Sequence, residues 1–76
     1  MGVDSMLNEG QRYYFKTNDG SEVCGTMYRV LTNGRMVLED VDILTELGTA
    51  HYLEQITLYN DDIAQIYDYD TDKRIY

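Results

Sequence analysis

The feature that most constrains this chain is an alternation of apolar and polar residues that is interrupted by short turn signals. In the segment GTMYRVLTNGRMVLEDV, residues 25–41, the alternation stops at Asn33 and Gly34 and then resumes. Successive side chains of a β-strand point to opposite faces, so this pattern is typical of half-buried strands, and an Asn-Gly pair accepts the positive φ of a tight hairpin turn. The segment therefore predicts a β-hairpin with one face in a core.

The same alternation predicts five short strands in one mostly β domain. Tyr13 and Phe15 share one face of a first strand, which begins near Gln11 and ends at the Asn-Asp-Gly-Ser turn of residues 18–21. An Asp-Gly pair at such a place favours a tight hairpin. Further strands are expected over residues 22–31, 36–41, 52–59 and 63–67, with an inward row that contains Met36, Leu38, Val41, Ile56 and Leu58.

Two features of the sequence bear on how these strands are arranged: a glycine within a strand, and a segment whose spacing also fits a helix. Gly25 lies inside the second strand, where a glycine usually marks a sharp bend or a close approach of another backbone. A strongly bent second strand favours a small barrel. A helix over residues 42–47 remains an alternative, because Leu44 and Leu47 follow Val41 at helical spacing.

The two ends of the chain are expected to lie outside the barrel. A short helix is predicted before Gly10, because Asp4 or Ser5 can accept the first free amides of a helix and a glycine commonly ends one. The last residues are rich in charge and read as a solvated tail. The chain is therefore divided into an N-terminal helix over residues 1–9, a barrel over residues 10–67 and a charged C-terminal tail over residues 68–76.

Composition excludes several classes of protein. Fourteen acidic residues against six basic ones give a formal net charge of −8, which repels phosphate groups and makes nucleic acid an unfavourable direct partner. Cys24 is the only cysteine, so neither an internal disulfide nor a cysteine-based zinc cluster is expected. No apolar run has the length of a membrane span. We therefore expect an intracellular protein, cytoplasmic or nuclear, without membrane contact.

No arrangement of residues predicts catalysis or a cofactor. The tail begins like the calcium-loop pattern D-x-D-x-D, but Lys73 stands where that loop needs a glycine. His51 and Cys24 are far apart in the sequence and lack an evident third partner, so no nucleophile with its base and orienting group is predicted. We expect no enzymatic activity, no metal and no cofactor.

The order of the glycines and apolar positions resembles the Sm/LSm family over residues 10–67. The first Sm signature is similar to the series Gly10, Tyr13, Phe15, Gly20, Gly25 and Met27. The segment MVLEDV, residues 36–41, resembles the third strand of LSm subunits, and ITLYNDDIAQI, residues 56–66, resembles the second signature. The resemblance implies a short N-terminal helix on a strongly bent, five-stranded antiparallel Sm-like barrel of the SH3-like type.

The resemblance also implies a protein partner that pairs with the fourth or fifth strand of the barrel. Family members join subunits through these edges, so we expect another Sm-like domain or a second copy as the partner. Tyrosine is enriched at interface cores, and the expected interface residues are Tyr14, Tyr28, Ile63, Ala64, Gln65 and Tyr67. Each tyrosine on its own can equally be a half-exposed residue of a sheet. The implied function is protein interaction within an RNA-processing or ribonucleoprotein assembly factor complex.

The RNA-contact positions of the family are occupied by different residues here. Leu31 and Arg35 stand where RNA-binding members carry an Asp and an Asn, and Tyr59 and Asn60 stand where they carry Arg-Gly. We therefore expect RNA binding only indirectly, through partners. Three alternatives stay open: an RNA-binding subunit of an LSm-type ring with a rebuilt site at Arg35 and Tyr59, a targeting domain of an RNA-processing nuclease, and a reader of methylated side chains.

Overall fold

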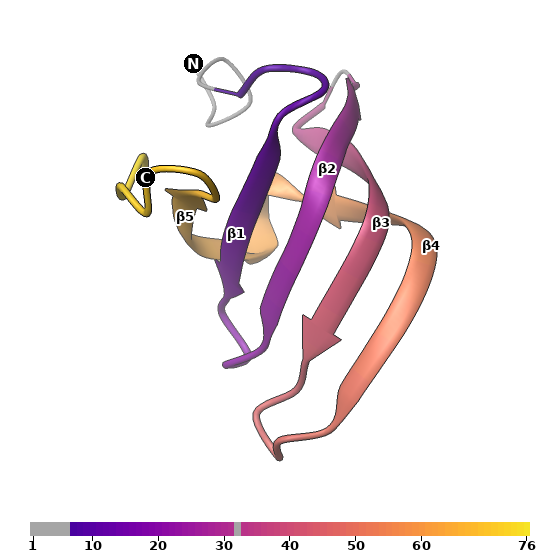
Figure 1. Ribbon diagram of the computed structural model, residues 1–76, viewed down its shortest axis with the longest axis vertical. Coiled ribbons are helices and arrows are strands. Elements are labelled where there is room, and N and C mark those ends of the chain that lie inside the picture. Colours follow the sequence, from indigo (N-terminus) through magenta and orange to yellow (C-terminus); the bar gives the residue numbers. More distant parts are fainter. Residues whose placement is uncertain (1–6, 32) are drawn as a thin grey trace.

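The computed structural model describes residues 7–31 and 33–76 and contains five strands (Figure 1). A 3-10 turn, η2 (Asn60–Asp62), joins the last two strands. The strands are β1 (Arg12–Thr17), β2 (Glu22–Val30), β3 (Arg35–Leu44), β4 (Ala50–Tyr59) and β5 (Ile63–Asp68). Each expected strand is present, and the predicted bounds of β3 and β4 are too short.

All five strands form one antiparallel sheet in the order β4-β3-β2-β1-β5. The sheet is strongly bent, so that the chain leaves β4 and crosses behind the other strands to reach β5 beside β1 (Figure 1). β4 and β5 do not pair with each other, so the sheet is not closed into a complete barrel. The expected architecture is therefore confirmed as a bent sheet with β4 and β5 at its two edges.

The core lies inside this bend and is built from the predicted inward row. Tyr13 and Phe15 are almost fully buried and meet edge to face with their ring centroids 6.2 Å apart. Met36, Leu38 and Val41 are buried as the alternation predicts. Leu7, Val23, Met27, Leu58, Ile63 and Ile66 complete the buried cluster, and Val30, Ile43, Ile56 and Ile75 pack against it.

Gly25 lies at the bend of β2, where a side chain would be crowded by its neighbours. A Cβ atom there would come within 3.2 Å of both Leu38 Cβ and Val41 Cγ2. The ladder between β2 and β3 shifts register at this place, and Asp40 on β3 takes a positive φ of 54°. An irregular residue of this kind increases the local twist, so Gly25 and Asp40 together let the sheet bend.

Two sequence expectations need correction. The predicted N-terminal helix does not include Leu7–Glu9, which are not helical, and its remaining residues 1–6 lie outside the described part of the chain. The alternative helix over residues 42–47 is wrong, because Asp42–Leu44 continue β3 and pair with β4. Their ladder pairing with β4 outweighs the helical spacing of the apolar residues.

The end of the chain also differs from the expected solvated tail. The C-terminal segment, residues 69–76, remains charged and largely exposed, but it folds back beside β5 and forms an isolated bridge between Tyr67 and Arg74. In Figure 1 this segment is the yellow trace next to β5. Most of its side chains stay in solvent, while its backbone satisfies hydrogen bonds of an otherwise open edge.

Candidate protein interface

The outer edge of β4 is the largest open strand edge in the structure. β4 has ten residues, and in the described part of the chain it pairs only with β3. The side to which each β4 amide points can be assigned from the neighbouring turn. There the Asn60 amide points toward β3 and donates to the Gly34 carbonyl at 2.7 Å. Adjacent residues of a strand direct their backbone groups to opposite sides, so the amides of Tyr59 and Thr57 point away from β3.

Apolar side chains are exposed where β3 meets β4. Leu44 is 43% exposed, Leu47 is 88% exposed, and Tyr52 and Leu53 are 58% and 39% exposed. Leu44 and Tyr52 line an open cavity of about 410 Å³, together with Tyr14, Cys24 and Ala50. Exposed apolar groups beside a free strand edge are typical of a surface that binds another protein.

The strand β5 places its predicted interface residues in different environments. Ile63 is 5% exposed and belongs to the core, so its side chain is not available to a partner. Ala64 is exposed, whereas Gln65 and Tyr67 are half-buried. The Tyr67 hydroxyl donates to Gln65 Oε1 at 3.0 Å, and Lys16 Nζ lies 5.7 Å from the centre of the Tyr67 ring. Most of this set is therefore engaged within the chain.

Tyr14 and Tyr28 are exposed as predicted, but they contact different groups. Tyr14 is 39% exposed and stacks on Tyr69 of the C-terminal segment, with ring centroids 6.0 Å apart. Tyr28 is 46% exposed and lies near the end of β2, where the Arg29 guanidinium is 5.6 Å from its ring centre. The structure does not join these two tyrosines into one surface.

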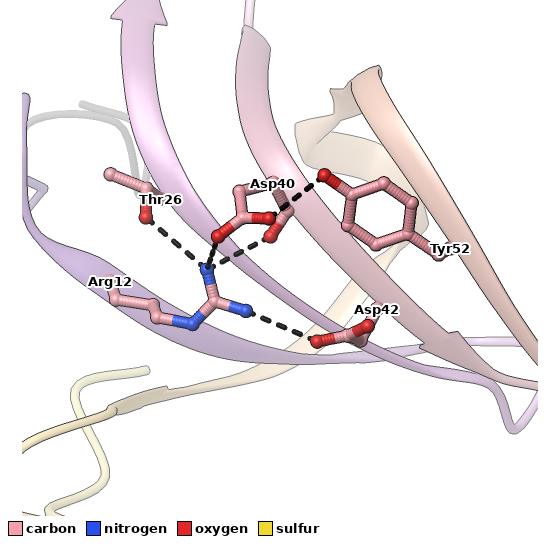
Figure 2. Close-up of polar contacts among 5 residues, drawn as sticks. All are labelled: Arg12, Thr26, Asp40, Asp42 and Tyr52. Carbon is pink, nitrogen blue, oxygen red and sulfur yellow. Dashed lines mark hydrogen bonds and ion pairs between the residues drawn. The ribbon is translucent and has the colours of Figure 1, made fainter.

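A polar network centred on Arg12 holds the outer face of the sheet together (Figure 2). The Arg12 guanidinium donates to the Asp40 carbonyl oxygen at 2.9 Å and to Asp42 Oδ2 at 3.3 Å, and it also reaches Thr26 Oγ1. The Tyr52 hydroxyl donates to Asp40 Oδ1 at 2.9 Å. These contacts connect all four strands from β1 to β4, so the free edge of β4 is fixed to the rest of the sheet.

Two ionisable side chains of this face, Tyr52 and Cys24, have shifted pKa values. The hydrogen bond to Asp40 raises the pKa of the Tyr52 hydroxyl, which therefore stays protonated as a donor. Burial raises the pKa of the Cys24 thiol, which keeps it in the less nucleophilic protonated form. Within the described residues, no group of three or more His, Cys, Asp or Glu side chains could hold a metal ion.

The four positions that stand for the family's RNA contacts lie together at the end of the β3–β4 ladder. Arg35 is the cross-strand partner of Tyr59, and the Leu31 amide donates to the Arg35 carbonyl at 2.8 Å. Asn60 follows directly and packs so closely on Gly34 that a Cβ there would come within 2.9 Å of Asn60 Cβ. Arg35 Nε and Asn60 Oδ1 are buried without a hydrogen-bond partner among the described residues. The structure brings these four positions together, and what they bind stays a prediction.

Sequence reasoning missed the Arg12 network and the folded C-terminal segment. Arg12 was visible only as a polar residue in an alternating strand, and its partners Asp40 and Asp42 are 28 and 30 residues away. Tyr69 was counted within a charged tail, although the Arg12 guanidinium lies 5.4 Å from its ring centre. The alternation of β1 signalled that Arg12 faces outward, but no local signal named its partners.

Comparison with solved structures, but not with family models or curated sequences, supports the fold. No family model matches the sequence, and no curated protein matches it at a significant level. Among the described residues, no helix has the length and apolar character required to cross a membrane.

Solved structures do match. A heptameric archaeal Sm protein, described for its implications for the eukaryotic snRNP core, superimposes with a TM-score of 0.66 at 17% identity, covering 78% of this chain and 85% of that chain. The P. aerophilum SmAP1 heptamer gives 0.66 at 17% identity, over 78% of each chain. A chain of the NatC complex bound to CoA gives 0.68 at 10% identity, over 76% of this chain and 74% of that chain. The chain therefore has an Sm-like fold.

Proposed function

We propose that this protein is an Sm-like protein-interaction domain that associates with another Sm-like subunit by pairing edge strands, within an RNA-processing or ribonucleoprotein assembly. The observation that carries the proposal is the open ten-residue edge of β4 beside exposed apolar side chains. Unpaired ladder groups of an edge strand are a template for strand addition, and apolar neighbours add affinity. The proposed activity is binding, without catalysis.

The similar structures support this proposal by analogy. Two of the matched proteins form heptamers, and the third belongs to a multi-component complex. One of the heptamers was related to the snRNP core, which is why we place the partner of this chain among RNA-associated proteins. A small domain of this size buries a limited core, so an additional interface would also stabilise it.

Direct RNA binding is the weaker candidate. Arg35 and Tyr59 are cross-strand neighbours and could present a cation and a stacking ring, but the adjacent turn carries Asp61 and Asp62, both exposed. These two carboxylates repel phosphate at the place where it would approach. We expect no affinity for oligouridine tighter than about 10⁻⁴ M, the weak end of non-specific binding. Micromolar binding that is lost in Arg35→Ala would favour the ring-subunit alternative.

The experiment that tests the proposal compares two changes at one exposed edge position. Proline at Thr57 removes an outward-pointing amide from β4, whereas alanine at Thr57 keeps it. We expect Thr57→Pro to abolish copurification of the partner from the native cell, and Thr57→Ala to retain it, with equal circular dichroism spectra. If both variants retain the same partner, association does not use the β4 edge and the proposal is wrong.

A further inference from the structure

We propose that the C-terminal segment is a built-in competitor for the outer edge of β5, so that this chain accepts a partner strand on β4 only and ends an assembly instead of continuing it. The inference rests on the edge-pairing function proposed above and specifies which of the two edges accepts a partner. A subunit of a closed ring needs two free edges, one for each neighbour. Within the part of the chain that the structure describes, only the edge of β4 is free along its length.

The backbone of the C-terminal segment uses the groups of β5 that a neighbouring strand would need. The Ile66 amide donates to the Tyr76 carbonyl at 3.0 Å, and the Ile66 carbonyl accepts the amides of Ile75 and Tyr76 at 2.7 and 3.2 Å. Two residues further on, the Asp68 amide donates to the Lys73 carbonyl at 2.8 Å. Residues two apart share one side of a strand, so these bonds cover one continuous stretch of the outer edge.

Side chains anchor the C-terminal segment at both of its ends. Tyr69 stacks on Tyr14, lies beneath the Arg12 guanidinium and donates its amide to the Arg12 carbonyl at 3.1 Å. Ile75 is half-buried and packs against the hydrophobic core. A segment that is held by an aromatic stack, a cation and a core contact does not leave the edge without losing all three.

The turn that reverses the chain is also specifically built. Asp68 Oδ1 accepts the amides of Asp70 and Thr71 at 2.9 and 3.1 Å, and the Asp68 carbonyl accepts the Asp72 amide at 2.9 Å. Asp72 takes a positive φ of 58°, a conformation that Asp, Asn and Gly adopt more readily than other residues. The local sequence therefore favours the folded-back arrangement.

The unpaired edge of β4 and the charge of the chain indicate which kind of protein can bind. β4 can accept a strand from a subunit whose own edge is not covered, whereas a second copy of this chain can offer only its β4. Two copies each carry a net charge of −8, which opposes that symmetrical pairing. The fitting partner is therefore a different, less acidic β-sheet protein with a free edge strand.

A truncation tests the competition directly. We compare the full chain with a variant that ends at Tyr69, by analytical ultracentrifugation over a range of concentrations at high salt and by hydrogen exchange of the Ile66 amide. The full chain should not exceed a dimer, and its Ile66 amide should be protected. The truncated variant should associate beyond a dimer, and its monomer should exchange the Ile66 amide at least about tenfold faster. Adding Thr57→Pro to the truncated variant should abolish the association.

Substitutions at Asp72 provide a milder test that keeps the chain at full length. Asp72→Gly should slow exchange at Ile66 several-fold, because glycine adopts the positive φ without strain. Asp72→Val should accelerate it about tenfold, because a β-branched residue is strained there. Asp72→Asn is the matched control, since it removes the charge but tolerates the same backbone conformation, and it should resemble the wild type.

Two outcomes would overturn the inference, and they have different consequences. A full chain that forms assemblies larger than a dimer would show that the C-terminal segment does not limit association to β4, which leaves the proposed function intact. A truncated variant with an unprotected Ile66 amide that stays monomeric would show that the freed β5 edge does not bind a strand. The proposed function would then depend only on the comparison of Thr57→Pro with Thr57→Ala at β4.

Discussion

The two outer strands of the sheet occupy equivalent places in the topology but have different surroundings. β4 presents an open edge of ten residues with exposed leucine and tyrosine side chains at one end. β5 has six residues, and the C-terminal segment covers part of its outer edge. Open edges risk unwanted pairing, and proteins commonly shorten or cover them. Under the proposed function, the exposed edge of β4 is the one that binds a partner, while the C-terminal segment protects β5.

The two edges remain connected through the turn between β1 and β2. The Asn18 amide donates to the Asp62 carbonyl at 2.9 Å, and Asn18 Nδ2 donates to the Asp61 carbonyl at 2.8 Å. Both acceptors belong to η2, the turn that leads from β4 to β5. The hairpin turn of residues 18–21 therefore fixes the direction in which the chain passes from the open edge to the covered one.

The largest effect is expected where the bend separates the two edges. Gly25→Val would place two methyl groups against Leu38 and Val41, whose atoms already lie 3.2 Å from a Cβ at this position. We expect a loss of about 1–3 kcal/mol in the free energy of unfolding from overpacking and backbone strain. Chemical denaturation measures it, and Gly25→Ala should show a smaller loss. An unchanged midpoint for Gly25→Val would contradict the packing at the bend.

Proline substitutions in the two edge strands should lower the stability of the fold by different amounts. The Ile66 amide points outward to Tyr76, so the neighbouring Gln65 amide faces β1, where Gln65 pairs with Lys16. Gln65→Pro should therefore lower the stability of the fold by about 1–3 kcal/mol through the lost ladder bond. Ala64→Pro and Thr57→Pro should be less damaging to the fold. Thermal denaturation compares the three, and equal stabilities would mean that the assigned backbone alternation is wrong.

The Arg12 network should matter for the β4 side more than for β5. Removing the guanidinium in Arg12→Ala leaves Asp40 and Asp42 without their cation, and we expect a loss of about 1 kcal/mol for this partly exposed group. Arg12→Lys keeps the charge but cannot donate to Thr26, Asp40 and Asp42 at the same time as the guanidinium does, so it should recover part of the loss. Hydrogen exchange should show the greater increase in β3 and β4. An increase confined to β5 would indicate that Arg12 acts mainly through Tyr69.

The smallest effect is expected at the turn that connects the two edges. The Thr17 hydroxyl and the Ser21 amide donate to Asp19 and lower the pKa of its carboxyl from 3.8. A lowered pKa in the folded state means that Asp19 stabilises the fold above pH 3.8 and that this contribution is lost as the pH falls through the lowered value. Asp19→Asn should be slightly less stable than the wild type at neutral pH and equal to it in strong acid. A difference that persists in acid would show that charge is not its source.

Local patterns predicted the strands because each strand buries one face. The alternation from Tyr13 to Phe15 and from Met36 to Leu38 identified core residues that the structure confirms, and the turn signals at residues 18–21 and 33–34 placed the hairpins correctly. Gly25 could be assigned to a bend because glycine within a strand is costly unless a close approach requires it. Ile63 was assigned to an interface, although its place in the alternation also fits the core that it occupies.

By itself, the sequence determined the strand order along the chain, the inward row and the positions of the turns, because these depend on neighbours two to four residues apart. Only the tertiary structure decided which edge stays open. The covering of β5 depends on Tyr69 meeting Tyr14 and on Ile75 reaching the core, and the Arg12 network depends on residues about 30 positions apart. Such contacts arise only after the sheet has bent, so the charged composition of the last residues could not indicate that they would pair with a strand.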